Sequence, residues 1–194
     1  METVITPAQL ETWEETGYLH LPGFLSSVEV GELRNWVEEI STWPTDAHRW
    51  MHHFEQTSFG PQLARTEYLI AYHEGIRRLL TRSKIVEVAG KLLSEPVVLY
   101  KEKINYKYPG GGGYAAHQDA PAYEFVKSHI TCSLAIDPAT VENGCLFFVP
   151  GLHRQGLLYP DQNGCIAGVR GHVELGSRAD AAGGCRFFQF VRAS

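Results

Sequence analysis

The triplet His117-Gln118-Asp119 contains two side chains that can bind a metal, separated by one residue. Side chains alternate along an extended strand, so on a strand His117 and Asp119 would point to one face and Gln118 to the other. An imidazole nitrogen and a carboxylate oxygen would then converge on one point. With a second histidine from a distant strand, they would form the two-histidine, one-carboxylate set that suits ferrous iron. Such a set leaves positions open for a bidentate 2-oxo acid and for dioxygen.

The spacing of this triplet does not by itself establish a metal site, because a chain with nine histidines has a sizeable risk of containing such a triplet by chance. A surface histidine and a surface aspartate are the plain alternative. The cluster His48, His52 and His53 is interpreted as loop residues rather than as a second metal site. The glycine run 110–113 is followed by no Gly-Lys-Ser/Thr, so it predicts a flexible lip beside an active-site mouth rather than a phosphate loop.

The elements that would position the triplet fall into a helical half and a strand-rich half. Thr6 with Gln9, and Ser26 with Glu29, are capping boxes that predict two helix starts, and Gly17 predicts the end of the first helix. Residues 43–74 lack a clear period and predict a loop-rich stretch. Residues 75–93 have helical spacing of apolar side chains. β-Branched and aromatic runs predict strands at 97–100, 104–106, 129–136, 145–149 and 185–191.

Helices followed by strands predict a mainly β protein with N-terminal helices, built as a double-stranded β-helix, the jelly-roll or cupin-like barrel. We expect a single domain over residues 1–194, with a helical support region at 1–95 and the jelly-roll core at 96–194.

Composition and charge exclude several classes of function. The formal net charge is -5, with no basic stripe, which argues against a nucleic-acid partner. No stretch is apolar enough for a membrane span, and the acidic N-terminus does not read as a targeting peptide. The four cysteines contain no CxxC pair, so reduced thiols in a reducing compartment are expected. A cytoplasmic location is therefore predicted, and the oligomeric state is left open.

Several further segments, in order along the chain, resemble signatures of the phytanoyl-CoA dioxygenase family of iron(II)- and 2-oxoglutarate-dependent oxygenases. They are Gly17-Tyr18-Leu19-His20-Leu21-Pro22-Gly23-Phe24-Leu25-Ser26, residues 101–107 before the triplet, Ser133-Leu134-Ala135-Ile136-Asp137, Glu142-Asn143-Gly144-Cys145-Leu146 and Val149-Pro150-Gly151-Leu152-His153-Arg154. The likeness runs from about residue 17 to about residue 190. It implies the oxidation, usually hydroxylation, of a small organic substrate, with Fe(II) as cofactor and 2-oxoglutarate and dioxygen as cosubstrates.

Carried over residue by residue, the resemblance implies that His117 and Asp119 are iron ligands. It also implies a lysine on the strand before the triplet and a hydroxyl on the strand after it as ligands of 2-oxoglutarate, for which Lys103 and Thr131 are the candidates. A surface lysine and an ordinary strand threonine are the alternatives. His153 is expected to be structural, hydrogen-bonded within its own loop.

The resemblance fails at the end of the chain. The family continues through Ala-Gly-Asp and Phe-Phe to a second histidine ligand and an arginine that binds 2-oxoglutarate. Here Ala182-Gly183-Gly184 and Phe187-Phe188 are followed only by residues 189–194, and His172 lies upstream. We therefore expect a truncated or frameshifted C-terminus, a barrel incomplete at that end, and impaired iron and cosubstrate binding. The alternatives are an inactive family member that acts as a binding module, or a cupin-like metal protein that does not use 2-oxoglutarate. The substrate itself is not predicted.

Overall fold

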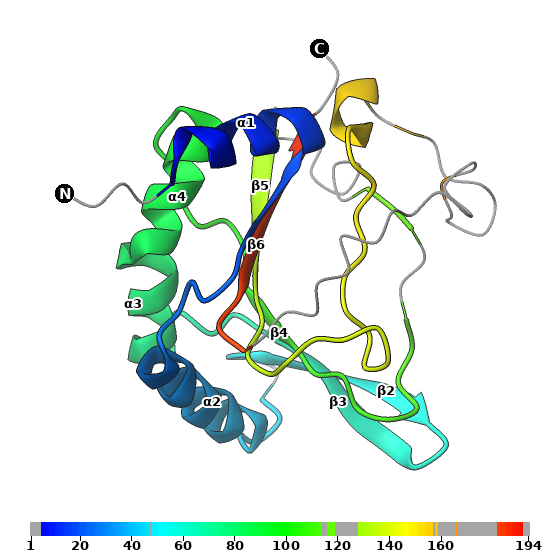
Figure 1. Ribbon diagram of the computed structural model, residues 1–194. Helices are drawn as coiled ribbons and strands as arrows, with labels where there is room; N and C mark the ends of the chain where they lie inside the picture. Colours follow the sequence, from blue (N-terminus) through cyan, green and yellow to red (C-terminus); the bar gives the residue numbers. More distant parts are fainter. Residues whose placement is uncertain are drawn as a thin grey trace. The chain divides into compact units, whose positions relative to one another are not determined.

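The computed structural model describes residues 5–46, 48–113, 116–118, 128–156, 158, 166 and 182–191 (Figure 1). The chain forms two compact units, one made of residues 1–25 and 114–194 and the other of residues 26–113. The iron ligand Asp119 predicted from the sequence lies outside the described residues, as does His172.

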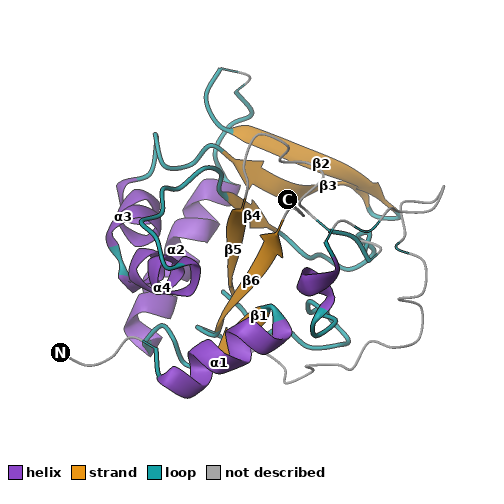
Figure 2. Ribbon diagram, turned by 90° about the horizontal axis from the view of Figure 1, so that it is seen from above, coloured by secondary structure: helices purple, strands orange, loops and turns teal. Residues whose placement is uncertain are grey.

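The first unit is built on a three-stranded antiparallel sheet with the strand order β1-β6-β5. Its strands are β1 (Tyr18–Leu21), β5 (Ser128–Leu134) and β6 (Cys185–Val191). Strand β6 lies between the other two and pairs with both, and Figures 1 and 2 show it beside β5. Phe187 and Cys185 on β6 are fully buried, and Leu19 on β1 is nearly so. The core of this unit therefore lies on the face of the sheet that carries these three side chains.

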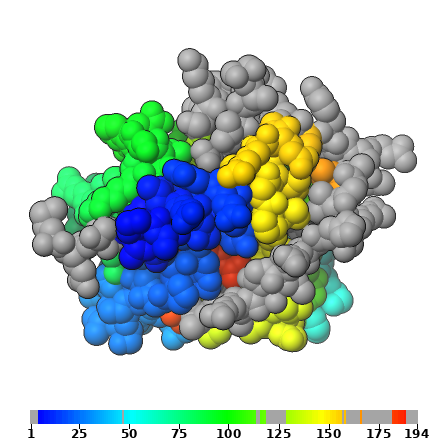
Figure 3. Space-filling model, turned by 45° about the horizontal axis from the view of Figure 1, so that its top comes forward, coloured from blue at the N-terminus to red at the C-terminus, as the bar shows by residue number. Residues whose placement is uncertain are grey.

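Helix α1 (Pro7–Thr16) precedes that sheet and begins and ends where the sequence predicts. Thr6 and Gln9 form the reciprocal capping box, and Gly17 ends the helix in the left-handed conformation with a φ of 79°. The short 3-10 helix η2 (Leu152–Gln155) packs against the C-terminal end of α1. Figure 3 shows the blue atoms of α1 beside the yellow atoms of the segment that contains η2.

The second unit contains the other sheet and three helices. The sheet is antiparallel with the order β2-β3-β4, formed by β2 (Met51–Thr57), β3 (Gly60–Glu67) and β4 (Lys103–Asn105). The helices are α2 (Ser27–Ser41), α3 (Glu74–Arg82) and α4 (Lys84–Leu93). The prediction of a loop-rich stretch over 43–74 is therefore wrong, because β2 and β3 form a hairpin there. A register shift between His53 and Phe54 breaks the alternation that would have indicated a strand.

The helix predicted over 75–93 is two helices, because Ser83 has extended backbone angles and interrupts it. The Ser83 hydroxyl donates to the carbonyl of Leu79 and accepts from the N–H of Ile85, so it ends one helix and starts the next. Two predicted strands are also absent from the described residues, at 97–100 and 145–149. Among those residues, no helix is both long and apolar enough to cross a membrane.

Candidate functional site

His117 lies in a short described segment, residues 116–118, that belongs to no strand. The carbonyl oxygen of Ala116, directly before it, accepts a hydrogen bond of 3.2 Å from the N–H of Ile166. The His117 side chain is exposed. The extended strand on which the alternation argument depended is therefore not present at His117, although one neighbour of the histidine is fixed by a backbone hydrogen bond.

Gln118 fixes the other side of His117. Its side-chain Nε2 donates to the carbonyl oxygen of Gly156 at 3.0 Å, and its Oε1 accepts from the N–H of Leu158 at 2.8 Å. One half-buried amide thus satisfies a donor and an acceptor of a segment about forty residues away in sequence. The middle residue of the triplet therefore anchors this segment to Gly156 and Leu158.

The described residues supply one metal donor of the predicted set, the imidazole of His117. Among them, no group of three or more histidine, cysteine, aspartate or glutamate side chains is placed to hold a metal. A neutral imidazole is a ligand that suits ferrous iron, so the chemistry of His117 fits the predicted ion. The pairing of His117 with Asp119 stays a prediction.

Thr131 lies on β5 opposite Phe188 of β6 and is half-buried. By strand alternation it shares one face of the sheet with His129 and Ser133, and with Arg186 across the ladder. The ring of Phe148 covers part of this face, because its centroid lies 5.0 Å from that of Phe188. Thr131 therefore belongs to a partly covered face with several polar side chains, opposite to the apolar core face.

Arg186 is a residue that the sequence analysis did not single out. Its side chain is 3% exposed, its Nη1 donates to the carbonyl oxygen of Leu146 at 3.3 Å, and its guanidinium carbon lies 5.8 Å from the centre of the Phe148 ring. A buried cation in a strand has to be held by such contacts. The feature of the sequence that could have pointed to Arg186 is the presence of an arginine inside the apolar run of residues 185–191.

Lys103 lies on β4 directly opposite Glu67 of β3, in the second unit. The carboxylate of Glu67 is bound instead by two other cations, Arg65 with Nε at 2.7 Å and Lys101 with Nζ at 3.0 Å. Lys103 is exposed and forms no ion pair with the residues that the structure describes. Lys101, which precedes β4, is thus paired with a carboxylate, and the role of Lys103 as a ligand of 2-oxoglutarate stays a prediction.

The glycine run 110–113 is attached to the β2–β3 hairpin through Gly112, and its role as a flexible lip beside an active-site mouth stays a prediction. The N–H of Gly112 donates to the Glu55 carboxylate at 3.1 Å, and the ammonium of Lys107 donates to the carbonyl oxygen of Gly112 at 3.2 Å. A Cβ on Gly111 would lie 2.5 Å from an oxygen of Glu55. A larger residue at this position would therefore require the Glu55 side chain to move.

His153 has a structural role, but not within its own loop as predicted. Its Nε2 lies 3.2 Å from the carbonyl oxygen of Glu14, and the guanidinium of Arg154 donates to the same oxygen at 2.7 Å. A Cβ at Gly17 would overlap the His153 ring. Gly17 is thus needed both for its positive φ and for its contact with this imidazole.

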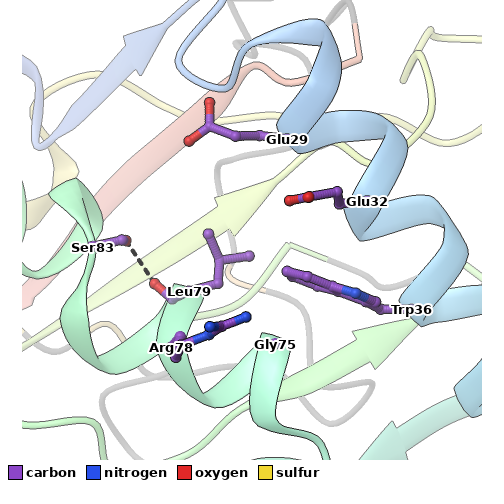
Figure 4. A pocket seen from close by; sticks show the side chains of 7 residues that line it. All are labelled: Glu29, Glu32, Trp36, Gly75, Arg78, Leu79 and Ser83. Carbon is purple, nitrogen blue, oxygen red and sulfur yellow. Dashed lines mark hydrogen bonds between the residues drawn. The ribbon is translucent and has the colours of Figure 1, made fainter.

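A small hollow of about 240 Å³ lies between α2 and α3 in the second unit (Figure 4). Glu29, Glu32 and Trp36 line it from α2, opposite Gly75, Arg78 and Leu79 of α3, with Ser83 at one end. Its volume is below the range of about 300–1,000 Å³ that is usual for ligand pockets. It contains none of the predicted site residues, so it is not the candidate site.

The sequence model of the family described as Phytanoyl-CoA dioxygenase (PhyH) matches residues 13–166 of this chain, which is most of its length. The chain belongs to this family. The segments that resembled its signatures therefore occupy the matched region, and the sequence-based recognition is confirmed.

Two curated relatives act on phosphonates by name. The methylphosphonate hydroxylase of Gimesia maris is 66% identical over 166 residues, covering 86% of this chain and 64% of the relative. The 2-aminoethylphosphonate dioxygenase of an uncultured bacterium is 38% identical over 165 residues, covering 83% of this chain and 63% of the relative. The chain thus spans less than two-thirds of the length of either relative.

Solved structures of iron- and 2-oxoglutarate-dependent proteins share the fold. EctD from S. alaskensis, crystallised with 2-oxoglutarate and 5-hydroxyectoine, matches with a TM-score of 0.80 at 20% identity, covering 98% of this chain and 69% of EctD. The non-heme alpha ketoglutarate dependent epimerase SnoN from nogalamycin biosynthesis matches with a TM-score of 0.70 at 25% identity, covering 97% of this chain and 79% of SnoN. The predicted double-stranded β-helix with N-terminal helices is confirmed by this likeness and by the two antiparallel sheets.

Proposed function

We propose that this family member is an iron(II)- and 2-oxoglutarate-dependent dioxygenase that hydroxylates a small organic substrate. The reaction would consume dioxygen and 2-oxoglutarate and would yield succinate, carbon dioxide and the hydroxylated product. The observation that carries the proposal is His117-Gln118-Asp119 within the region matched by the family, with Gln118 anchoring the backbone between the two donors.

In this proposal His117 and Asp119 hold the iron, which would supply the activation of dioxygen. Lys103 would bind a carboxylate of 2-oxoglutarate through its ammonium group, which is supported by its exposure and by the pairing of Glu67 with two other cations. Thr131 would donate a hydrogen bond to the same cosubstrate from the polar face of its sheet. In each of these roles the side chain only has to bind and orient the iron or the 2-oxoglutarate.

The substrate we propose is a small organophosphonate, with methylphosphonate as the first candidate. Support comes from the names of the two curated relatives, one of them 66% identical to this chain. Methylphosphonate has one carbon atom, so its hydroxylation would convert the methyl group to a hydroxymethyl group and leave the carbon–phosphorus bond intact.

The test is an aerobic assay with Fe(II), 2-oxoglutarate and methylphosphonate, in which succinate is measured by mass spectrometry and the phosphonate product by phosphorus NMR. It is run on this chain and on the chain extended by the C-terminal segment of the Gimesia maris relative. We expect equal amounts of succinate and hydroxymethylphosphonate, and loss of both in His117→Ala. Thr131→Val should raise the KM for 2-oxoglutarate more than it lowers kcat.

The outcomes separate the parts of the proposal. Activity in the extended chain only would support both the function and the predicted need for a further histidine and arginine. Succinate formation that no phosphonate stimulates would contradict the substrate but not the chemistry. Metal binding without succinate formation in either protein would contradict the dioxygenase and favour a metal-binding module.

A further inference from the structure

Two cysteine thiols face each other across the β5–β6 ladder. The sulfur atoms of Cys132 and Cys185 lie 3.3 Å apart. Cys132 pairs in register with Phe187, and Cys185 with Leu134, so the two cysteines are diagonal neighbours on adjacent strands. The strands β5 and β6 run side by side in both ribbon views (Figures 1 and 2). Both sulfurs therefore project to the same face, which is the apolar one.

The two thiols differ in their access to solvent. Cys185 is fully buried, whereas Cys132 is half-buried. Phe187, beside them on the same face, is fully buried and contacts the ring of Phe24 edge-on, with centroids 6.2 Å apart. A small oxidant therefore reaches Cys132 first. Cys185 contacts the sulfur of Cys132 but is itself shielded from the oxidant. This is the arrangement of an attacked sulfur and a resolving sulfur.

We propose that Cys132 and Cys185 form a peroxide-sensitive dithiol that oxidises to a disulfide within one chain. A hydroperoxide transfers one oxygen atom to the Cys132 sulfur, which gives a sulfenic acid and, from hydrogen peroxide, one water molecule. The Cys185 sulfur then attacks the Cys132 sulfur and displaces the hydroxyl group, which leaves as a second water with the Cys185 proton. Two thiols and one hydrogen peroxide thus become one disulfide and two waters.

The consequence of the bond follows from its position in the chain. The two cysteines are 53 residues apart in sequence, so the disulfide closes a long loop and reduces the entropy of the unfolded chain. It also joins β5 to β6 next to Thr131, which stands directly before Cys132. The oxidised form should therefore unfold at a higher temperature than the reduced form. This inference does not depend on the proposed dioxygenase activity.

The test exposes the reduced full chain to hydrogen peroxide, removes the reagent, and counts thiols in denaturant. Of the four thiols in the chain, two should be lost, and dithiothreitol should restore them. Peptide mapping by mass spectrometry should find a Cys132–Cys185 crosslink. Cys132→Ser and Cys185→Ala should abolish the crosslink and the rise in Tm. Cys145→Ser is the matched control, and it should retain both.

Three results would overturn the proposal. The first is a sulfinic acid on Cys132 with no crosslink to Cys185. The second is a disulfide that instead uses Cys145 or Cys165, and the third is a disulfide between two chains. If Cys185→Ala does not fold, Cys132→Ser together with peptide mapping of the unsubstituted chain still decides the matter.

Discussion

The carboxylate of Glu55 accepts a hydrogen bond from the backbone N–H of Gly112, across 57 residues of sequence and 3.1 Å of space. This contact attaches the glycine run to strand β2. The run ends only a few residues before His117 in the sequence. A carboxylate bound by a backbone N–H is a charge-assisted hydrogen bond, which is stronger than a neutral one. The run therefore has a defined position on the hairpin despite its glycine content.

We predict that Glu55→Ala releases this glycine run. Hydrogen exchange measured by mass spectrometry should become faster in the peptide that contains residues 110–113, while exchange in α1 stays unchanged. Gly111→Ala should have a similar effect, because its Cβ would collide with Glu55. The double variant should be no worse than Gly111→Ala. Unchanged exchange in Glu55→Ala would contradict the contact.

The end of helix α1 provides a prediction about strain. In Gly17→Ala, the left-handed backbone should cost about 1–2 kcal/mol of stability. The overlap of the new Cβ with the ring of His153 should add a further penalty. His153→Ala removes the overlap but not the backbone strain. Denaturant unfolding of both single variants and the double variant should therefore show that the Gly17→Ala penalty is smaller when His153 is absent. Simple additivity of the two penalties would contradict the contact.

The ion cluster of Glu67, Arg65 and Lys101 predicts an asymmetry between substitutions. The Glu67 side chain is 6% exposed, whereas those of Arg65 and Lys101 are 30% and 40% exposed. Arg65→Met leaves a buried carboxylate with one partner and should cost up to about 3 kcal/mol. Glu67→Gln leaves cations that can reach water and should cost less. Equal penalties in denaturant unfolding would contradict this account.

The start of helix α2 predicts a dependence on acid pH. The hydrogen bond from the N–H of Ser26 to the Glu29 carboxylate lowers the pKa of Glu29, helped by the Ser26 hydroxyl and by Lys84. A lowered pKa in the folded state contributes stability above the unfolded pKa of about 4.5, and this contribution is lost as pH falls through the folded value. In Glu29→Gln, the free energy of unfolding should therefore fall less steeply as the pH drops below 4.5 than it does in the unsubstituted protein. The control Glu32→Gln should keep the steeper fall. The same acid profile in both variants would contradict the prediction.

Local signals in the sequence predicted the helix ends well, because a cap is made by residues three positions apart. Thr6 with Gln9, Ser26 with Glu29, and Gly17 are all found as expected. The strands at 129–136 and 185–191 were also predicted to within two residues, because each pairs along its whole length.

Predictions failed where a partner distant in sequence decides the structure. Residues 97–100 have strand composition, yet Val98 is 92% exposed and belongs to no described strand. Residues 145–149 are held by the side chains of Arg186 and Phe188 rather than by a ladder. The anchoring by Gln118 and by Glu55 could not be foreseen either, because each joins segments about forty or more residues apart.

The most direct test of the central claim is an anaerobic titration of the apoprotein with Fe(II), with binding measured by calorimetry in the presence of 2-oxoglutarate. It compares the unsubstituted chain with His117→Ala, Asp119→Ala and the control Asp137→Ala. We predict that both substitutions in the triplet weaken iron binding at least tenfold, since each removes a direct ligand, and that the control has no effect. Iron binding that is as tight in Asp119→Ala as in the unsubstituted chain would contradict the assignment of these two residues as a shared iron site.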